Sequence, residues 1–162
     1  MSARDVLSIE GLKTYFRTEA GVARAVDGVD LTVRDGEVLG IVGESGSGKS
    51  VTALSTLKLI PDPPGFIAGG RVLFEGRDLL AMSYEEIRTV RGRKISMVFQ
   101  EPMTSLNPVF TIGDQVAEAV RVHTCVGRRE ALDRALAMLD MVGIPDARRR
   151  IHDPFRPRIT CA

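Results

Sequence analysis

The strongest constraint on this chain is a glycine-rich octapeptide between an apolar run and a segment of helical periodicity. The run VLGIV occupies residues 38–42 and the octapeptide GESGSGKS occupies residues 43–50. An apolar run that carries no polar residue on either face is typical of a strand buried inside a covered parallel sheet. Helical spacing follows from Lys49 to about Ile60, where prolines interrupt it. The pattern predicts a strand, a tight loop and a helix, the last with these core-facing residues: Val51, Leu54, Leu57 and Leu59.

The octapeptide fits the pattern G-x-x-x-x-G-K-[ST], which in this strand–loop–helix context is typical of a phosphate-binding loop for ATP or GTP. Its glycines allow positive φ angles, so that successive N–H groups turn inward at the start of the helix. We expect Lys49 to reach the β- and γ-phosphates and the Ser50 hydroxyl to bind Mg²⁺, whereas Thr52 is expected on the helix surface. A glycine-rich turn without a ligand is the alternative. The residues expected to contact the nucleotide are Gly43, Glu44, Ser45, Gly46, Ser47, Gly48, Lys49, Ser50 and Val51.

Strands and helices alternate along the rest of the chain. Strand patterns fill residues 6–34, with turns predicted at Asp27-Gly28 and Asp35-Gly36. The segment GGRVLFEGRDL predicts a further strand and turn, and KISMVF, residues 94–99, predicts another strand. Between them, SYEEIRTVRG predicts a short helix with Ser83 as its cap and Glu86 at the capping-box position.

Two longer helices are predicted near the end, at residues 112–123 and 128–142, and such a pair suggests a separate lobe. The last ten residues, DPFRPRITCA, show no periodicity.

Composition limits the partners. With 22 basic and 21 acidic residues the formal charge is +1, which gives no general attraction to nucleic acid. The basic run Arg148 to Arg150 is interpreted as a solvated helix end. No apolar run approaches the roughly 20 residues that cross a bilayer, and MSARDVLSIE lacks a secretory pattern, so we expect a cytoplasmic protein.

The segment KISMVFQEPMTSLNP, a strand pattern ending in Gln100 before a proline-containing loop, resembles the glutamine loop of ABC-transporter ATPase subunits. Together, GESGSGKS and VFQEPMTSLNPVFTIGDQ resemble the ATP-binding subunits of oligopeptide, dipeptide and nickel importers, over residues 6 to about 151. The resemblance implies an α/β P-loop NTPase core with an antiparallel β subdomain and the start of a helical subdomain, incomplete in this chain. The implied domains are 1–111 for the core and β subdomain, 112–152 for the helical subdomain and 153–162 for an atypical tail.

The same resemblance implies roles for particular residues. Gln100 would bind Mg²⁺ or the attacking water and act with Lys49 in catalysis, and Phe16, or Tyr15 as the alternative, would stack on adenine. The implied cofactors are ATP and Mg²⁺. The implied partners are a second ATPase subunit, identical or different, and membrane-spanning permease subunits, which alone would hold the protein at the inner face of the cell membrane.

Three family features are absent from the sequence: a segment like LSGGQ, a Walker B strand and a switch histidine. The resemblance therefore leads us to expect a chain that stops inside the helical subdomain, binds ATP·Mg²⁺ and hydrolyses it weakly or not at all. Two alternatives remain. One is a P-loop kinase or GTPase fragment, although no NKxD segment is present; the other is an interaction fragment that binds no nucleotide.

Overall fold

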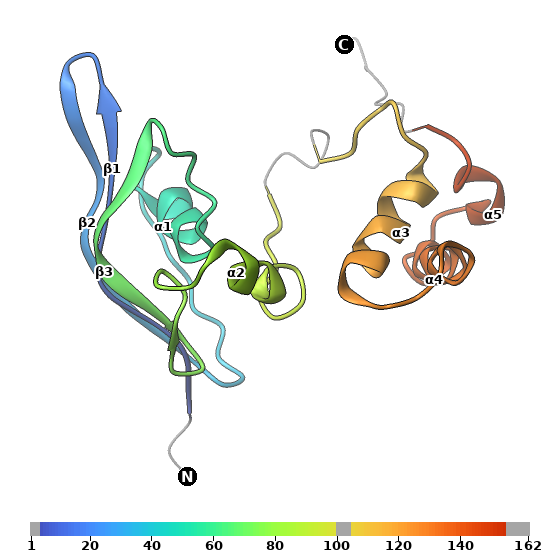
Figure 1. Cartoon of the computed structure of the whole chain (residues 1–162), viewed down its shortest axis with the longest axis horizontal. Helices are drawn as coiled ribbons and strands as arrows, with labels where there is room; N and C mark the ends of the chain where they lie inside the picture. Colours follow the sequence, from blue (N-terminus) through green and yellow to red (C-terminus); the bar gives the residue numbers. More distant parts are fainter. Residues whose placement is uncertain (1–3, 100–104, 155–162) are drawn as a thin grey trace. The chain divides into compact units, whose positions relative to one another are not determined.

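The computed structural model describes residues 4–99 and 105–154 (Figure 1). The chain forms two compact units, the first ending at Arg88 and the second beginning at Thr89. Within the described ranges, none of the helices is both long enough and apolar enough to cross a membrane.

The first unit is built on an antiparallel sheet of four strands in the order β2-β1-β3-β4. As predicted, strand patterns at the start of the chain form a hairpin of β1 (Asp5–Thr18) and β2 (Gly21–Arg34), and a turn follows at Asp35-Gly36. The predicted strand and turn near residue 70 are also confirmed, as β3 (Gly65–Phe74) and the short β4 (Arg77–Asp78). The long hairpin gives the sheet one face that can hold a helix.

The prediction of a turn at Asp27-Gly28 is wrong, because both residues lie inside β2. Leu12 pairs with Val29 and Lys13 with Asp27, so Gly28 is an extra residue in β2, and its φ is +84°. A β-bulge with glycine at positive φ uses the same residue types as a tight turn. The Asp-Gly dipeptide therefore indicated a positive φ correctly, but this φ belongs to a β-bulge and not to a turn.

Helix α1 (Lys49–Thr56) lies against one face of the sheet (Figure 1). It ends about four residues earlier than predicted, because the chain turns at Lys58, where φ is +51°. The Lys58 ammonium donates to the carbonyl oxygens of Leu80 and Met82, at 3.1 and 2.7 Å. These bonds tie the end of α1 to the segment after β4.

The buried face of α1 is polar, so the expectation that Thr52 lies on the helix surface is wrong. Thr52, Ser55 and Thr56 are buried, and each side-chain hydroxyl donates to the carbonyl four residues earlier. Because these bonds satisfy the hydroxyl protons, the small polar side chains can pack against the sheet at little cost. Of the predicted core-facing residues in and after α1, Leu57 is buried and the others are half-buried.

Helix α2 (Tyr84–Val90) confirms the predicted capping box. The Ser83 Oγ accepts from the Glu86 N–H at 3.3 Å, and the Glu86 carboxylate accepts from the Ser83 N–H at 2.9 Å. These two bonds satisfy donors that the first turn of a helix leaves without partners. Ile87 then anchors α2 as a buried residue.

Residues 38–42 do not form the predicted strand. They have no regular secondary structure, and Val38 and Val42 are 96% and 97% exposed. A strand is stable only when its N–H and C=O groups pair with neighbours, and in the described parts of the chain no strand pairs with this segment. The predicted strand at residues 94–99 is also wrong, since only Ile95 forms a bridge, to Arg91, and Val98 is exposed.

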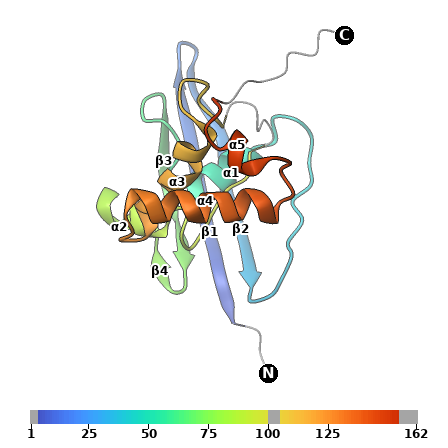
Figure 2. The same ribbon diagram turned by 90° about the vertical axis from the view of Figure 1, so that its right-hand side faces the viewer.

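The second unit contains the two predicted helices, α3 (Ile112–His123) and α4 (Arg128–Met141), followed by the single turn α5 (Ala147–Arg150). Figure 2 shows α4 along its length with α5 beside it. Small residues allow the helices to approach closely, because Ala117 of α3 and Ala131 and Ala135 of α4 are buried with Ile151. The predicted domain boundary at residues 111 and 112 remains a prediction.

Gly113 fixes the segment after α5 to the start of α3. Its N–H donates to the Ile151 carbonyl at 2.8 Å, and the Ile112 N–H donates to the Asp153 carbonyl at 3.0 Å. A Cβ at position 113 would lie 2.5 Å from Ile151 Cγ1 and 2.7 Å from the Ile151 oxygen. Only glycine allows this approach.

Candidate functional site

The predicted phosphate loop runs directly into α1, and its last glycine is required by packing as well as by conformation. Gly48 has φ +89°, and a Cβ there would collide with the carbonyl oxygen of Ala25 in β2. Gly46, at φ +83°, has open space around its missing side chain. The loop therefore rests against β2 at one glycine and is open at the other.

The start of α1 is suited to an anion. Gly48 is the N-cap residue and provides no side-chain hydrogen bond to the helix, and the first turn of α1 contains no acidic residue. The first N–H groups of a helix lack intrahelical acceptors and carry partial positive charge. Phosphate oxygens are the kind of acceptor that such a helix start binds.

Lys49 points into the loop. Its ammonium donates to the carbonyl oxygens of Gly43 and Glu44, both at 2.7 Å, and contacts Ser47 Oγ at 3.1 Å. An ammonium has three protons, so these three oxygens satisfy it completely. A phosphate oxygen would replace one of them, and the longest contact, to Ser47, is the easiest to replace.

Ser50 occupies the first turn of α1 with an exposed side chain. A hydroxyl oxygen is one of the hard ligands that Mg²⁺ accepts, and here it lies beside the loop that would hold the phosphates. This single hydroxyl could serve a Mg²⁺ only if a bound nucleotide and water supplied the remaining ligands. Among the described residues, no group of three acidic, histidine or cysteine side chains forms a separate metal site.

Phe16 lies on the face of the sheet that α1 covers. Thr14, Tyr15 and Phe16 pair in continuous register with Ile67, Phe66 and Gly65 of β3, so Phe16 shares a face with Thr14. Thr14 is hydrogen-bonded to Ser55 of α1, which identifies that face. A Cβ on Gly65 would touch both the Phe16 ring and Ile60. Gly65 thus leaves room for the ring beside the segment that follows α1.

Tyr15 lies on the opposite face. Its ring meets the edge of the Phe66 ring, with centroids 6.0 Å apart, and its hydroxyl donates to Asp27 at 2.7 Å. That hydrogen bond to Asp27 is the main cause that raises the pKa of Tyr15. The two candidate aromatic residues are therefore separated by the sheet itself.

Gln100, the predicted catalytic glutamine, lies outside the described residues. The structure also reveals a pair that sequence reasoning missed: the hydroxyls of Thr14 and Ser55 are 2.8 Å apart and buried. A signal for Ser55 was present, because it lies in α1 near two other hydroxyl residues, Thr52 and Thr56. Apolar periodicity concealed it, since the neighbouring leucines suggested a different buried face.

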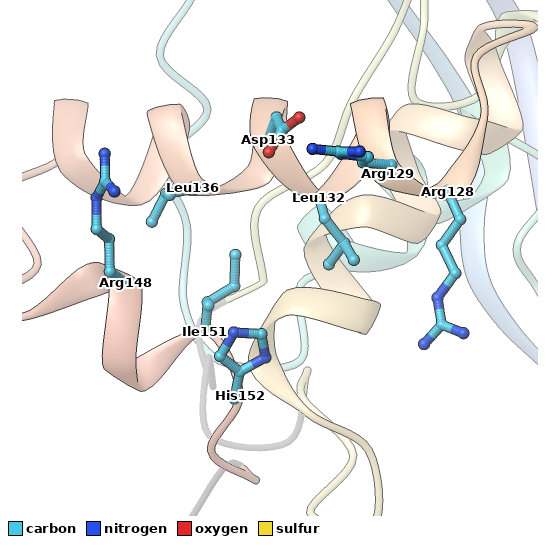
Figure 3. A pocket seen from close by; sticks show the side chains of 8 residues that line it. All are labelled: Arg128, Arg129, Leu132, Asp133, Leu136, Arg148, Ile151 and His152. Atoms are coloured by element: carbon cyan, nitrogen blue, oxygen red, sulfur yellow. The ribbon is translucent and has the colours of Figure 1, made fainter.

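A hollow of about 580 Å³ lies in the second unit, whose helices α3, α4 and α5 form what we call the helical unit (Figure 3). Leu132 and Leu136 of α4 point toward Ile151, and Arg128 and Arg148 lie at opposite ends of these apolar side chains. The hollow has no glycine-rich loop and differs in kind from the phosphate site. Its lining residues are Arg128, Arg129, Leu132, Asp133, Leu136, Arg148, Ile151 and His152.

Comparison with known proteins identifies the family of this chain, because one family model matches most of its length. The family described as ABC transporter matches residues 26–156, which include the loop, α1 and the helical unit. The chain belongs to the ABC transporter family. The predicted fold class is confirmed as well, because the solved structures that it resembles are cassettes of this family.

Several curated relatives are similar over nearly the whole chain. A putative peptide import ATP-binding protein of Brucella abortus is 55% identical over 155 residues, which are 93% of this chain and 46% of the relative. The oligopeptide transport ATP-binding protein OppD of Bacillus subtilis is 45% identical over 147 residues, 91% of this chain and 41% of that protein. The chain thus spans less than half the length of these relatives.

Among solved structures, a dimeric bacterial ABC transporter cassette matches with a TM-score of 0.75 and 23% identity. A post-hydrolysis state of an ATP-binding cassette, bound to ADP and Pi, matches with a TM-score of 0.73 and 21% identity. Each match covers 91% of this chain and 61% of the other. At these identities the likeness concerns the fold.

Proposed function

We propose that this chain binds ATP·Mg²⁺ as part of the energy-coupling subunit of an importer for peptides or a related small solute. The family, and the peptide-import role in the names of relatives at 45–55% identity, support this proposal. In the whole protein, ATP hydrolysis would drive transport. A second ATPase subunit and membrane-spanning permease subunits would be its partners, and they would hold it at the cytoplasmic face of the membrane.

The observation that carries the proposal is the position of the Lys49 ammonium within the glycine-rich loop. Carbonyl oxygens of Gly43 and Glu44 hold it at 2.7 Å, directly before an α1 start that has no side-chain cap. The Lys49 ammonium and the first N–H groups of α1 would then both contact a bound anion. Both kinds of donor favour the β- and γ-phosphates of a nucleotide. Ser50 would share the Mg²⁺ with those phosphates.

Two further roles belong to the proposal. Phe16 would stack on adenine, because it shares the face of the sheet with α1 and its ring lies beside Gly65. Gln100 would orient the attacking water or bind Mg²⁺, as the resemblance to the glutamine loop implies. Bound Mg²⁺ would neutralise charge that develops on the phosphates.

Calorimetric titration with ATP·Mg²⁺ tests the proposal. Lys49→Ala removes a charge-assisted contact of about 1.5–3 kcal/mol, so the affinity should fall roughly ten- to hundred-fold. Lys13→Ala removes the same charge from β1 and serves as the control, with little change expected.

Phosphate release is measured with the same samples. Because the 162 residues contain no Walker B carboxylate, we expect turnover by this chain to stay near the background of the Lys49→Ala variant. Equal ATP affinity of the wild type and Lys49→Ala would contradict the proposed function. Turnover comparable with ordinary ATPase subunits would contradict the expected weak hydrolysis.

A further inference from the structure

A buried hydroxyl pair joins the sheet to the phosphate-loop helix. Thr14 Oγ1 of β1 and Ser55 Oγ of α1 are 2.8 Å apart, and both residues are 0% exposed. They are separated by 41 positions in the sequence. The pair is therefore a specific tertiary contact in a part of the fold from which water is excluded.

The direction of this hydrogen bond follows from counting protons. Ser55 Oγ donates its proton to the Val51 carbonyl at 2.6 Å. A hydroxyl has one proton and two lone pairs, so Ser55 can only accept from Thr14. The bonds form a directed chain from the Thr14 hydroxyl, through Ser55, to the carbonyl of Val51.

The ends of this chain lie close to two parts of the proposed nucleotide site. Thr14 precedes Phe16 by two residues on one strand face, so it holds the stretch of β1 that carries the ring. Val51 follows Ser50 in the first turn of α1. The hydrogen-bonded chain thus connects the strand of the proposed base contact with the turn of the proposed phosphate contact.

We infer that the Thr14–Ser55–Val51 chain is a positioning device that sets the spacing between the Phe16 ring and the phosphate loop. This inference rests on the proposed function and adds Thr14 and Ser55, two buried residues that are not among those expected to contact the nucleotide. Adenine and triphosphate are covalently linked, so both contacts form at full strength only when the protein holds the two sites at the matching distance. Thr14 therefore determines how much the base adds to the affinity that the triphosphate alone provides.

The test compares two probes, ATP·Mg²⁺ and Mg²⁺·tripolyphosphate, by calorimetry on the full chain. Thr14→Val keeps the shape of the side chain and removes the hydroxyl. We expect the preference of the protein for ATP over tripolyphosphate to fall about three- to ten-fold, as the loss of one buried hydrogen bond permits. Affinity for tripolyphosphate should change less than about two-fold, because the loop keeps its own contacts.

Three further variants keep the result interpretable. Thr14→Ser retains a hydroxyl and should restore the preference for ATP. The double variant Thr14→Val/Ser55→Ala makes both partners apolar, a change that leaves no buried hydroxyl without a partner and is therefore the safest for folding. Thr18→Val removes an equivalent hydroxyl from the exposed end of β1, where it donates to the Gly21 carbonyl, and should leave the preference unchanged.

Each contrary result has a distinct meaning. An unchanged preference in Thr14→Val and in the double variant would overturn the inference. Equal losses for ATP and tripolyphosphate would also overturn it, because they would indicate general damage to the loop. If the wild type lacks Lys49-dependent binding of either probe, the proposed function itself fails, and the inference fails with it.

Discussion

At the scale of single residues, Phe16 and Tyr15 offer similar rings one position apart, but β1 turns them to opposite faces of the sheet. Tyr15 is held by Phe66 and Asp27, whereas Phe16 shares its face with the contact to α1. Sequence alone could name both residues, because each is an aromatic residue ahead of the loop. The resemblance favoured Phe16 and kept Tyr15 as the alternative, but which of the two shares a face with α1 depends on the fold and could not be derived from the sequence.

Phe16→Ala should weaken ATP binding roughly ten-fold, because an aromatic ring that stacks on a base contributes about 1–3 kcal/mol. Tyr15→Ala, which removes a ring from the opposite face, should have little effect and is the matched control. Stacking discriminates poorly between bases, so GTP should bind nearly as well as ATP. Titration with a fluorescent ATP analogue measures both variants, and equal losses would show that the assignment to Phe16 is wrong.

Asp114 lies in the first turn of α3, where its carboxylate takes part in the N-terminal cap. Its carboxylate accepts from Thr111 Oγ1 at 2.9 Å and from Arg128 at 3.0 Å. The hydrogen bond from Thr111, followed by that from Arg128, lowers the pKa of Asp114 below its ordinary value. A lowered pKa in the folded state means that the unfolded chain binds the proton more readily.

The stability that Asp114 contributes should therefore be complete above its unfolded pKa of about 3.9 and disappear as the pH falls through the lower folded value. Urea unfolding of the wild type and Asp114→Asn at several pH values measures this contribution. We expect the difference in the free energy of unfolding to shrink on acidification. Asp140→Asn, at an exposed position on α4, is the control and should give a smaller difference in the free energy of unfolding than Asp114→Asn. A difference that grows at low pH would contradict the assignment.

At the scale of elements, hydrophobic period and local caps predicted α3, α4 and the capping box of α2, because all of these depend on near neighbours in the sequence. The wrong predictions concern features that depend on contacts between residues far apart in the sequence. Gly28 became a bulge because β1 continues past it, and α1 buried its hydroxyl face because Ser55 meets Thr14. No periodicity in the sequence contains that information.

Gly113→Ala tests the contact between α3 and the segment after α5. Because the new Cβ would lie 2.5 Å from Ile151 Cγ1 and 2.7 Å from its carbonyl oxygen, the segment must move. We expect a loss of about 1–3 kcal/mol in the free energy of unfolding, despite the better helix propensity of alanine. Gly40→Ala, at a position where no atom lies within 4 Å of the new Cβ, is the control. Thermal unfolding followed by circular dichroism measures both, and equal stabilities would contradict the predicted collision.

At the scale of the whole molecule, the sequence predicted the family but placed residues 38–42 in a covered parallel sheet. The apolar run predicted burial because such runs are normally paired on both edges. In the described structure, strands β1 to β4 form an antiparallel sheet that does not include this segment. Which partner a strand finds depends on the rest of the fold, and local sequence cannot supply it.

The exposed valines of this segment should promote self-association. An exposed apolar segment whose backbone N–H and C=O groups are not paired can pair with the same segment of another molecule. The double variant Val38→Thr/Val42→Thr replaces side chains that are 96% and 97% exposed, so it should leave the folded structure unchanged. We expect a larger monomer fraction than for the wild type in size-exclusion chromatography. Val22→Thr, on the exposed side of β2, is the control. If the double variant and the control elute like the wild type, this segment does not drive association.

The polar face of α1 has a consequence for temperature. Contacts between apolar groups weaken on cooling, because hydrophobic burial changes the heat capacity. The contact between α1 and β1 contains the hydrogen bond between Thr14 and Ser55, whereas Ala117, Ala131, Ala135 and Ile151 hold the helical unit together. Cooling should therefore weaken the apolar packing between these helices more than it weakens the hydrogen bond that joins α1 to β1.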